Sequence, residues 1–257
     1  MGILLMGAVS TLVFCAPGYP GGAGDAQPFV DQFAKGAAAS AGWPTDSLVA
    51  VYDPSEQGGL EKLGSPDAVV AFVPYPFFVQ HVAELHLKPI AQADMSGIGP
   101  KERWTLVAKI GGPTTAASMS GYTILSVAGY APEFVRHSAL EGWTLPADVK
   151  IEYTGQILSA LRRVAAGERI VALLDQTQTA ALSTLPFGTQ LKPVKQSQLL
   201  PVAIVAAVNS RLPEARARAL QAGLLKMSQA AGGADTLGQL HLRGFVAPEL
   251  PEQKPAP

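Results

Sequence analysis

Several residue types are scarce in the chain, and each shortage narrows what the protein can be. The 257 residues include a single cysteine, Cys15, which excludes an intrachain disulfide framework and any metal site built from several cysteines. Charged residues make up only 15% of the chain, and the formal net charge is −1. Because a nucleic-acid-binding protein needs a basic face and no Lys/Arg-rich run occurs, we expect no nucleic-acid partner.

The motifs of several common enzymes are also missing. The chain has no Gly-Lys-Ser/Thr triplet of a phosphate-binding loop, no GxSxG nucleophile turn and no HExxH zinc motif. His81 and His86 are five residues apart and do not share a helix face, and Cys15 ends an apolar run, where an inert buried thiol is the ordinary interpretation. Glu133 with Asp175 is the one carboxylate pair that we consider for acid–base chemistry. We therefore expect no enzyme, no cofactor and no metal.

The N-terminus allows two interpretations. Residues 1–15 are nearly all apolar and contain no Lys or Arg, so the charged start of a secretory signal is missing. The run is too short for a membrane span. Either residues 9–15 form a buried first strand, with any signal trimmed or absent, or the run is a degenerate export signal.

Apolar runs alternate with segments of helical periodicity along the chain. In the first part, strands are expected at 9–15, 48–52 and 68–73, with helices at 28–41, 60–63 and 79–85. Further strands are expected at 90–91 and 105–108. A second series follows Gly111 to Pro113, with strands at 122–127, 149–153 and 170–174, helices at 132–140 and 156–166, and an edge strand at 191–194. A strand at 202–208 and a helix at 213–228 close the pattern. Successive strand–helix units predict mainly parallel sheets.

Four loops that follow apolar strands are the candidate ligand-binding segments. They carry glycine, proline or aromatic residues and would meet at the carboxyl edge of an open α/β sheet, where ligands bind. The opening loop lacks a GxGxxG spacing, and its prolines remove N–H donors that a phosphate cradle needs. Aromatic rings there could contact a ligand or simply fill the core, and Asp175 could contact a ligand or cap a helix. The candidate residues are Gly18, Tyr19, Tyr75, Phe77, Tyr130, Ala131, Glu133, Thr154, Asp175 and Gln176; Thr154 is also the expected N-cap of the helix that follows it.

The order of these motifs resembles the periplasmic solute-binding proteins of ABC importers, in the phosphate/phosphonate-binding branch. The resemblance rests on CAPGYPG (15–21), DAVVAFVPYPFF (67–78), ERWTLVAKIGG (102–112), SMSGYTILSVAGYAPEFVR (118–136), YTGQILSALRRVAAGERIVALLDQTQ (153–178) and LLPVAIVAAVNSRLP (199–213). It implies a type II, two-lobe α/β fold in which each lobe is a mainly parallel sheet flanked by helices. Lobe 1 would comprise 1–112 plus 200–247 and lobe 2 would comprise 113–199, followed by a disordered, proline-rich tail at 248–257.

The resemblance also implies a function. Such a protein captures a small organic ligand between its lobes by hinge closure and delivers it to an ABC permease in the inner membrane, as a monomer in the periplasm. One departure concerns the ligand: residues 129–133 offer no small hydroxyl side chain, Pro132 lacks an N–H donor, and Glu133 would repel phosphate. We therefore do not carry phosphonate specificity over, and a lipid- or sterol-type ligand and a ligand-sensing role stay open as alternatives.

Overall fold

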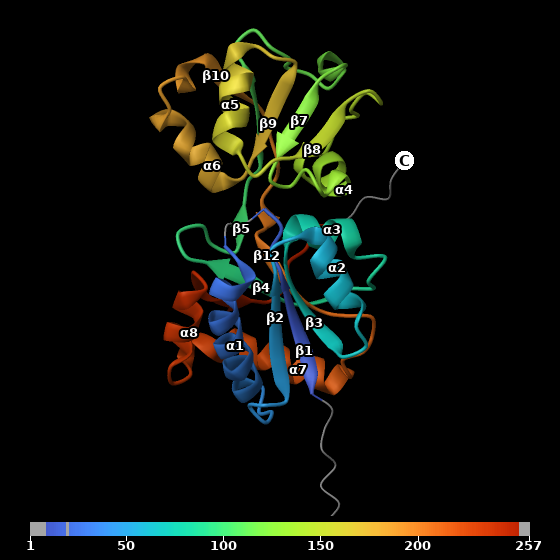
Figure 1. Ribbon diagram of the computed structural model, residues 1–257, viewed down its shortest axis with the longest axis vertical. Helices are drawn as coiled ribbons and strands as arrows, with labels where there is room; N and C mark the ends of the chain where they lie inside the picture. Colours follow the sequence, from blue (N-terminus) through green and yellow to red (C-terminus); the bar gives the residue numbers. More distant parts are fainter. Residues whose placement is uncertain (1–8, 19–20, 252–257) are drawn as a thin grey trace, which may run out of the picture. The chain divides into compact units, whose positions relative to one another are not determined.

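The computed structural model describes residues 9–18 and 21–251, and its contacts divide the chain into two compact units. Of the described residues, unit 1 contains 9–16, 21–100 and 201–251, and unit 2 contains 17–18 and 101–200. Figure 1 shows the helices and strands of both units. No helix in the described ranges is long and apolar enough to cross a membrane.

Unit 1 is built on a six-stranded mixed sheet. Its strand order is β13 (Leu242–Val246), β4 (Lys88–Met95), β12 (Ala203–Ala207), β3 (Ala68–Pro74), β1 (Ser10–Cys15) and β2 (Leu48–Asp53). The strands β3, β1 and β2 are parallel to one another, whereas β12 is antiparallel to both β3 and β4, and β13 is antiparallel to β4. Every residue of β1 and β3 is buried, as expected for strands that are covered on both faces.

Helices cover both faces of this sheet (Figure 1). On one face α1 (Ala23–Ser40), α7 (Glu214–Lys226) and α8 (Gly233–Gln239) pack together, while α2 (Glu56–Gly64) lies against the opposite face of β1 and β3. The short helix α3 (Tyr75–His81) follows β3 directly. Under α1, Phe14, Phe33, Phe72 and Phe245 form an aromatic cluster with ring centroids 4.9 to 6.0 Å apart. This cluster joins strands from both ends of the chain into one core.

Unit 2 is built on a five-stranded mixed sheet. Its strand order is β10 (Leu191–Gln196), β6 (Thr105–Lys109), β9 (Ile170–Leu174), β7 (Thr123–Ser126) and β8 (Lys150–Tyr153). The strands β9, β7 and β8 are parallel, and β6 and β10 run antiparallel to their neighbours. The helix α5 (Ile157–Ala166) buries Ala160, Leu161 and Val164 against the sheet and ends at Gly167, whose φ of 91° is left-handed.

The remaining elements are short. In unit 2, α4 (Pro132–Phe134) continues into a π-helical turn η2 (Val135–Ala139), and α6 (Gln176–Ala181) follows β9. The two-residue strands β5 (Lys101–Glu102) and β11 (Leu200–Pro201) pair where the chain passes between the units. Single 3-10 turns occur at η1 (Ala117–Met119), η3 (Leu182–Thr184), η4 (Gly188–Gln190) and η5 (Met227–Gln229).

The α/β fold predicted from the sequence is confirmed, with some differences in detail. The sheets are mixed rather than mainly parallel, because β12 and β6 return antiparallel to the parallel strands. The predicted lobe boundary at Gly112 differs from the contact division at 100/101, since β6 lies in the sheet of unit 2. The first strand is present as β1, whereas residues 1–8 and 252–257 lie outside the described residues. The elements α8 and β13 were not predicted.

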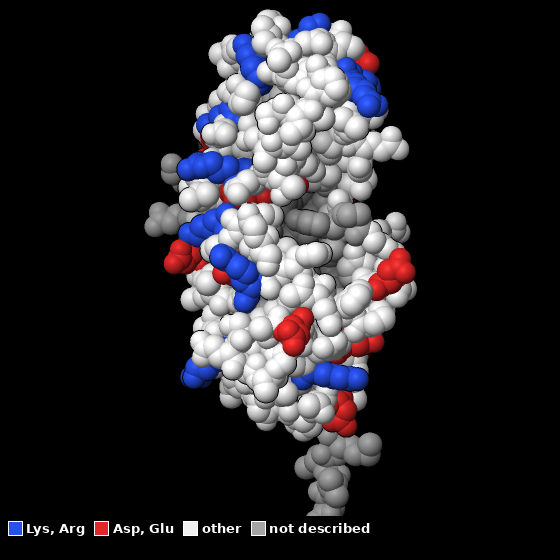
Figure 2. Space-filling view, turned by 90° about the vertical axis from the view of Figure 1, so that its left-hand side faces the viewer, with Lys and Arg blue, Asp and Glu red and all other residues white. Residues whose placement is uncertain are grey.

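Charged side chains are sparse on the surface. Over the face shown in Figure 2 the Lys and Arg side chains and the Asp and Glu side chains lie scattered, and uncharged residues cover most of the area. This agrees with a chain in which only 15% of the residues are charged.

Candidate functional site

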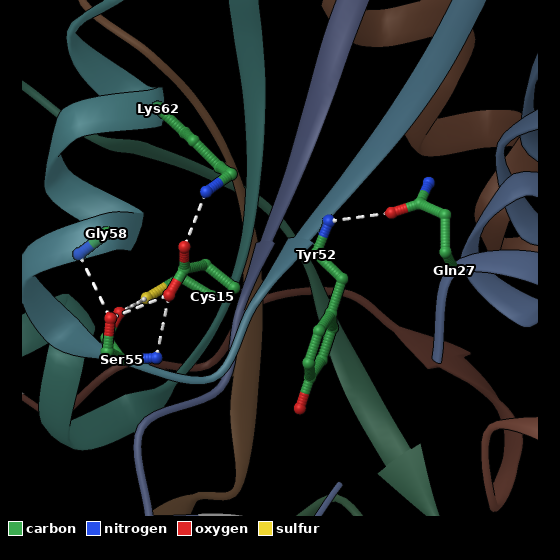
Figure 3. A network of polar contacts seen from close by, with 7 residues as sticks. Cys15, Gln27, Tyr52, Ser55, Gly58 and Lys62 are labelled. Atoms are coloured by element: carbon green, nitrogen blue, oxygen red, sulfur yellow. Dashed lines mark hydrogen bonds and ion pairs between the residues drawn. The ribbon is translucent and has the colours of Figure 1, made fainter. Parts of the chain in front are cut away.

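The first candidate edge lies in unit 1, at the carboxyl ends of the parallel strands β1, β2 and β3. Asp53, the last residue of β2, accepts hydrogen bonds from the backbone N–H (2.8 Å) and the hydroxyl (2.7 Å) of Ser55 and forms an ion pair with Lys62 (Figure 3). Burial raises the pKa of Asp53, but the hydrogen bonds from Lys62 and Ser55 outweigh it and hold the pKa below its ordinary value. Ser55 also caps α2 by accepting from Gly58 N at 3.1 Å. Asp53 therefore organises the β2–α2 loop.

Beside this network, Gln27 of α1 fixes the end of β2. Its side-chain amide donates to the carbonyl of Ala50 (2.8 Å) and accepts from the N–H of Tyr52 (3.3 Å; Figure 3). The Tyr52 ring is half-buried, and its phenol pKa is raised by burial and by the neighbouring Cys15 and Asp53. Sequence reasoning assigned this tyrosine only to a strand, because nothing in the pattern shows that it stands at the strand's exposed end.

Cys15 is an inert thiol, as its position in the sequence indicated. The residue is fully buried, and its Sγ lies 3.4 Å from the carbonyl oxygen of Ser55. Burial, together with the carboxylates of Asp53 and Glu56, raises the pKa of the thiol far above its ordinary value. Gly59 of α2 packs directly on this sulfur, where a Cβ would overlap it.

Two of the predicted ligand residues, Tyr75 and Phe77, are core residues of unit 1. Tyr75 is 2% exposed, donates its backbone N–H to the carbonyl of Val202 (3.0 Å) and stacks on Phe78 with centroids 6.2 Å apart. Burial raises the pKa of its phenol to about 12. Phe77 is fully buried against His81, with ring centroids 4.7 Å apart. A direct ligand contact would require both side chains to become exposed.

The opening loop is described only in part. Gly18 groups with unit 2, where a Cβ on it would lie 2.9 Å from the carbonyl oxygen of Val127. With a φ of 86° as well, the position requires glycine. Tyr19, also predicted to face the ligand, lies outside the described residues.

The second candidate edge lies in unit 2, at the carboxyl ends of β7, β8 and β9. Gly129, just after β7, packs on the peptide that joins Glu152 and Tyr153, where any Cβ would overlap the backbone. This close approach brings Tyr130 beside Tyr153, with ring centroids 6.5 Å apart at an interplanar angle of 57°. Tyr153 is 53% exposed. The sequence singled out Tyr130 but not its partner.

The residues after Tyr130 do not gather into a reactive group. Ala131 is buried and donates its N–H to the carbonyl of Ala128 (2.9 Å). Glu133 is exposed and lies 3.4 Å from His137. Asp175, which the sequence offered as its acid–base partner, instead caps α6.

A cavity of about 330 Å³ opens at the start of α5. The predicted role of Thr154 as N-cap is wrong, because Gln156 holds that position; Thr154 instead accepts the Gln156 N–H at 3.1 Å. Gln156 makes no side-chain capping bond, so no cap side chain covers the N–H groups of the first turn of α5. The cavity lining consists of Leu125, Tyr153, Thr154, Gly155, Gln156, Ser159, Ala160 and Arg163.

Asp175 and Gln176 begin α6. The Asp175 carboxylate accepts from Gln178 N (2.7 Å) and the Gln178 amide accepts from Asp175 N (3.2 Å), which together form a capping box. The capping interpretation of Asp175 is therefore confirmed. Burial raises the pKa of this carboxyl. Gln176 donates its backbone N–H toward Glu102 Oε2 at 3.4 Å.

Glu102 was missed by sequence reasoning. The residue is 3% exposed, and burial, followed by the charge of Asp175, raises its pKa to about 8. The Trp104 indole N–H faces this carboxyl and opposes the rise, but it lies outside hydrogen-bond geometry. Within the described ranges, Trp104 Nε1 is the buried side-chain polar atom without a hydrogen-bond partner. Because Lys101 and Arg103 flank Glu102, the sequence pattern there is that of an exposed charged segment and does not indicate a buried carboxyl.

Comparison with known families now identifies the chain. The model of the periplasmic substrate-binding protein of phosphonate ABC transporters matches residues 78–252. The chain belongs to this family. A search of curated proteins found no significant match.

Solved structures show the same fold at low sequence identity. A Xanthomonas citri protein solved with ATP bound is 13% identical, with a TM-score of 0.67 over 96% of this chain and 93% of that one. A binding protein component of an ABC phosphonate transporter from Pseudomonas aeruginosa is 16% identical, with a TM-score of 0.59 over 94% and 82%. PhnD1 from Prochlorococcus marinus, in complex with methylphosphonate, is 12% identical, with a TM-score of 0.56 over 93% of both chains.

Membership in the phosphonate-binding family confirms the predicted solute-binding role. The protein is a member of a family of substrate-binding transport components, and the family implies a solute, a membrane permease and a periplasmic location. The family does not favour the lipid-type alternative. The monomeric state and the lack of a nucleic-acid partner stay predictions.

Proposed function

We propose that this solute-binding protein takes a small organic anion with a tetrahedral phosphorus group, such as an alkylphosphonate, at the carboxyl edge of unit 2. The observation that carries the proposal is the cavity at the start of α5, where the first-turn N–H groups have no capping side chain. A helix N-terminus of this kind favours anions through its N–H groups and its dipole. The fold neighbours solved with methylphosphonate and with ATP both carry phosphorus oxyanions.

Polar and aromatic groups around the cavity suit such a ligand. The hydroxyl of Thr154 and that of Ser159 can donate to phosphonate oxygens, and the rings of Tyr130 and Tyr153 can cover an organic substituent. Arg163 lies at the cavity but pairs with Glu168 at 2.8 Å. We therefore assign the main attraction to the N–H groups and hydroxyls rather than to a full counter-charge.

The carboxylate of Glu133, which would repel a phosphorus oxyanion, is not part of the proposed site. Its exposed carboxylate lies against His137 and not among the cavity residues. The proposed anion site is at the end of β8 rather than at residues 129–133, which contain no small hydroxyl side chain.

Uptake would then follow the usual course for a two-lobe binder. We propose that capture of the solute involves a hinge motion at the crossing segments β5 and β11, where a few residues absorb the change in backbone angles. The closed form would be the one that the permease recognises. Of the predicted ligand residues, Tyr130 and Thr154 are part of the proposal, Gln176 acts through its backbone, and Tyr75 and Phe77 support the fold.

A matched pair of threonine variants tests the site. Thr154→Ala removes a hydroxyl at the cavity, whereas Thr184→Ala removes an exposed hydroxyl that bonds only the carbonyl of Ala181. By calorimetric titration with methylphosphonate, we expect Thr154→Ala to weaken binding by roughly ten-fold, the worth of one hydrogen bond to a charged group, and Thr184→Ala to leave it unchanged. Equal affinities of both variants and the unaltered protein would remove Thr154 from the site.

A further inference from the structure

Glu102 occupies a position that the proposed binding site does not by itself explain. It lies in β5, the strand on which the chain enters unit 2, and β5 pairs with β11, on which the chain leaves. Two residues further on, the backbone of Trp104 bonds the same return segment. Its backbone N–H donates to the Ser197 hydroxyl (2.9 Å), and its backbone carbonyl accepts from the N–H of Ser197 (2.9 Å). The segment that carries the Glu102 carboxyl is thus bonded to the return segment.

The other side of this carboxyl faces the ligand edge. Its Oε2 accepts from Gln176 N, and Gln176 is the first residue of α6, which Asp175 caps at the carboxyl end of β9. β9 is the sheet neighbour of β7, so this helix start and the loop of Tyr130 belong to the same edge. Glu102 therefore links the crossing strand β5 to that edge.

We propose that Glu102 is a positioning residue whose protonation state sets the strength of anion binding at the carboxyl edge of unit 2. This inference rests on the proposed function, because it assumes that the solute is an anion held at that edge. In the protonated form, Glu102 adds no charge beneath Asp175. In the ionised form, the buried carboxylate of Glu102 and the half-buried carboxylate of Asp175 are both charged near the start of α6, and their field opposes an incoming anion.

The surroundings decide which form is present. The titratable group that faces Glu102 from another element is Asp175 of the α6 cap. Lys101 and Arg103 flank Glu102 in the sequence, and the Arg103 guanidinium donates to the carbonyl of Ser197 (2.7 Å). Burial and the Asp175 charge raise the pKa of Glu102 to about 8, so the carboxyl is mostly neutral below that pH. Above that, the unpaired Trp104 N–H is a ready donor for the new charge, so ionisation should draw the indole toward the carboxylate.

The first test needs no solute, because Trp104 reports on its neighbour. Its fluorescence is followed from pH 6 to pH 10 in the full chain with Trp43→Phe and Trp143→Phe substitutions, which leave one tryptophan. We expect an emission change centred near pH 8 that disappears when Glu102→Gln is added. An unchanged transition in the Glu102→Gln protein, or no transition in either protein, would overturn the proposal.

The second test uses methylphosphonate as the probe, and calorimetry gives its affinity at pH 6.5 and pH 9.5. The ligand's own titration is common to both proteins, so the ratio of affinities between Glu102→Gln and the unaltered chain isolates Glu102. We expect this ratio to rise with pH by on the order of five-fold, because one added negative charge at a partly buried edge repels the anion. A constant ratio would contradict the proposal, whereas absence of any binding together with an intact fluorescence transition would locate the failure in the proposed ligand class.

Discussion

Replacing Glu102 by glutamine should stabilise unit 2 at high pH. Glutamine keeps the shape of the side chain and removes its charge. In the folded chain the pKa of Glu102 rises from 4.5 to about 8, mainly through burial, so the native state holds a proton that the unfolded chain releases above pH 4.5. A raised carboxyl pKa therefore lowers stability as pH increases from 4.5 to about 8.

The magnitude follows from that interval. Each pH unit costs about 1.36 kcal/mol of unfolding free energy while the folded and unfolded states differ by one proton. Over the whole interval from 4.5 to about 8 this amounts to at most about 5 kcal/mol, which Glu102→Gln would not lose. The stability of the variant relative to the unaltered chain should therefore grow between pH 5 and pH 9.

Urea unfolding followed by tryptophan emission measures this difference. In a Trp43→Phe background the remaining tryptophans, Trp104 and Trp143, are both in unit 2, so the transition of that unit is observed. Glu152→Gln, at an exposed position of β8, is the matched control and should show little change with pH relative to its parent. If Glu102→Gln and its parent differ by the same free energy at pH 5 and pH 9, Glu102 is ionised in the folded protein and the reasoning fails.

Two further predictions concern the edge of unit 2. Gly129→Ala should destabilise the protein by about 1–3 kcal/mol, because the new Cβ would overlap the Glu152–Tyr153 peptide. Thermal unfolding measures this loss, with Gly238→Ala as the control, since a Cβ at Gly238 meets no neighbouring atom within 4 Å. Equal melting temperatures of the two variants would contradict the packing at Gly129. Asp175→Ala should cost about 1 kcal/mol through loss of the α6 cap, and Asp175→Asn should retain most of it, as measured by urea unfolding; a larger loss in the asparagine variant would show that charge rather than capping matters.

The sequence predicts the fold well where the local residue pattern agrees with burial in the structure. The continuous apolar runs of β1 and β3 are buried on both faces, and Gly167 ends α5 in the left-handed conformation that glycine favours. Sheet membership was harder to predict. The family resemblance placed the strand expected at 105–108 (β6) in lobe 1, but its partners are β9 and β10, and the local sequence pattern does not reveal such pairings.

The site was harder to predict than the fold, because its features arise from tertiary contacts. Tyr130 stood out as an aromatic residue after a strand, but the approach of Gly129 to β8 that pairs it with Tyr153 has no local signal. Glu102 looks exposed in the sequence, but in the structure it is buried, in a strand that pairs with β11 and in contact with the first residue of α6. Conversely, Tyr75 follows an apolar strand, as a ligand-binding aromatic residue would, but its side chain lies in the core.

Calorimetric titration of the full chain with methylphosphonate tests the central proposal most directly. One saturable site with a dissociation constant of roughly micromolar order, corresponding to about −8 kcal/mol, is the predicted result, and a simple sterol should give no binding heat. Saturable binding of the sterol with no response to methylphosphonate would contradict a phosphorus-oxyanion site at the start of α5.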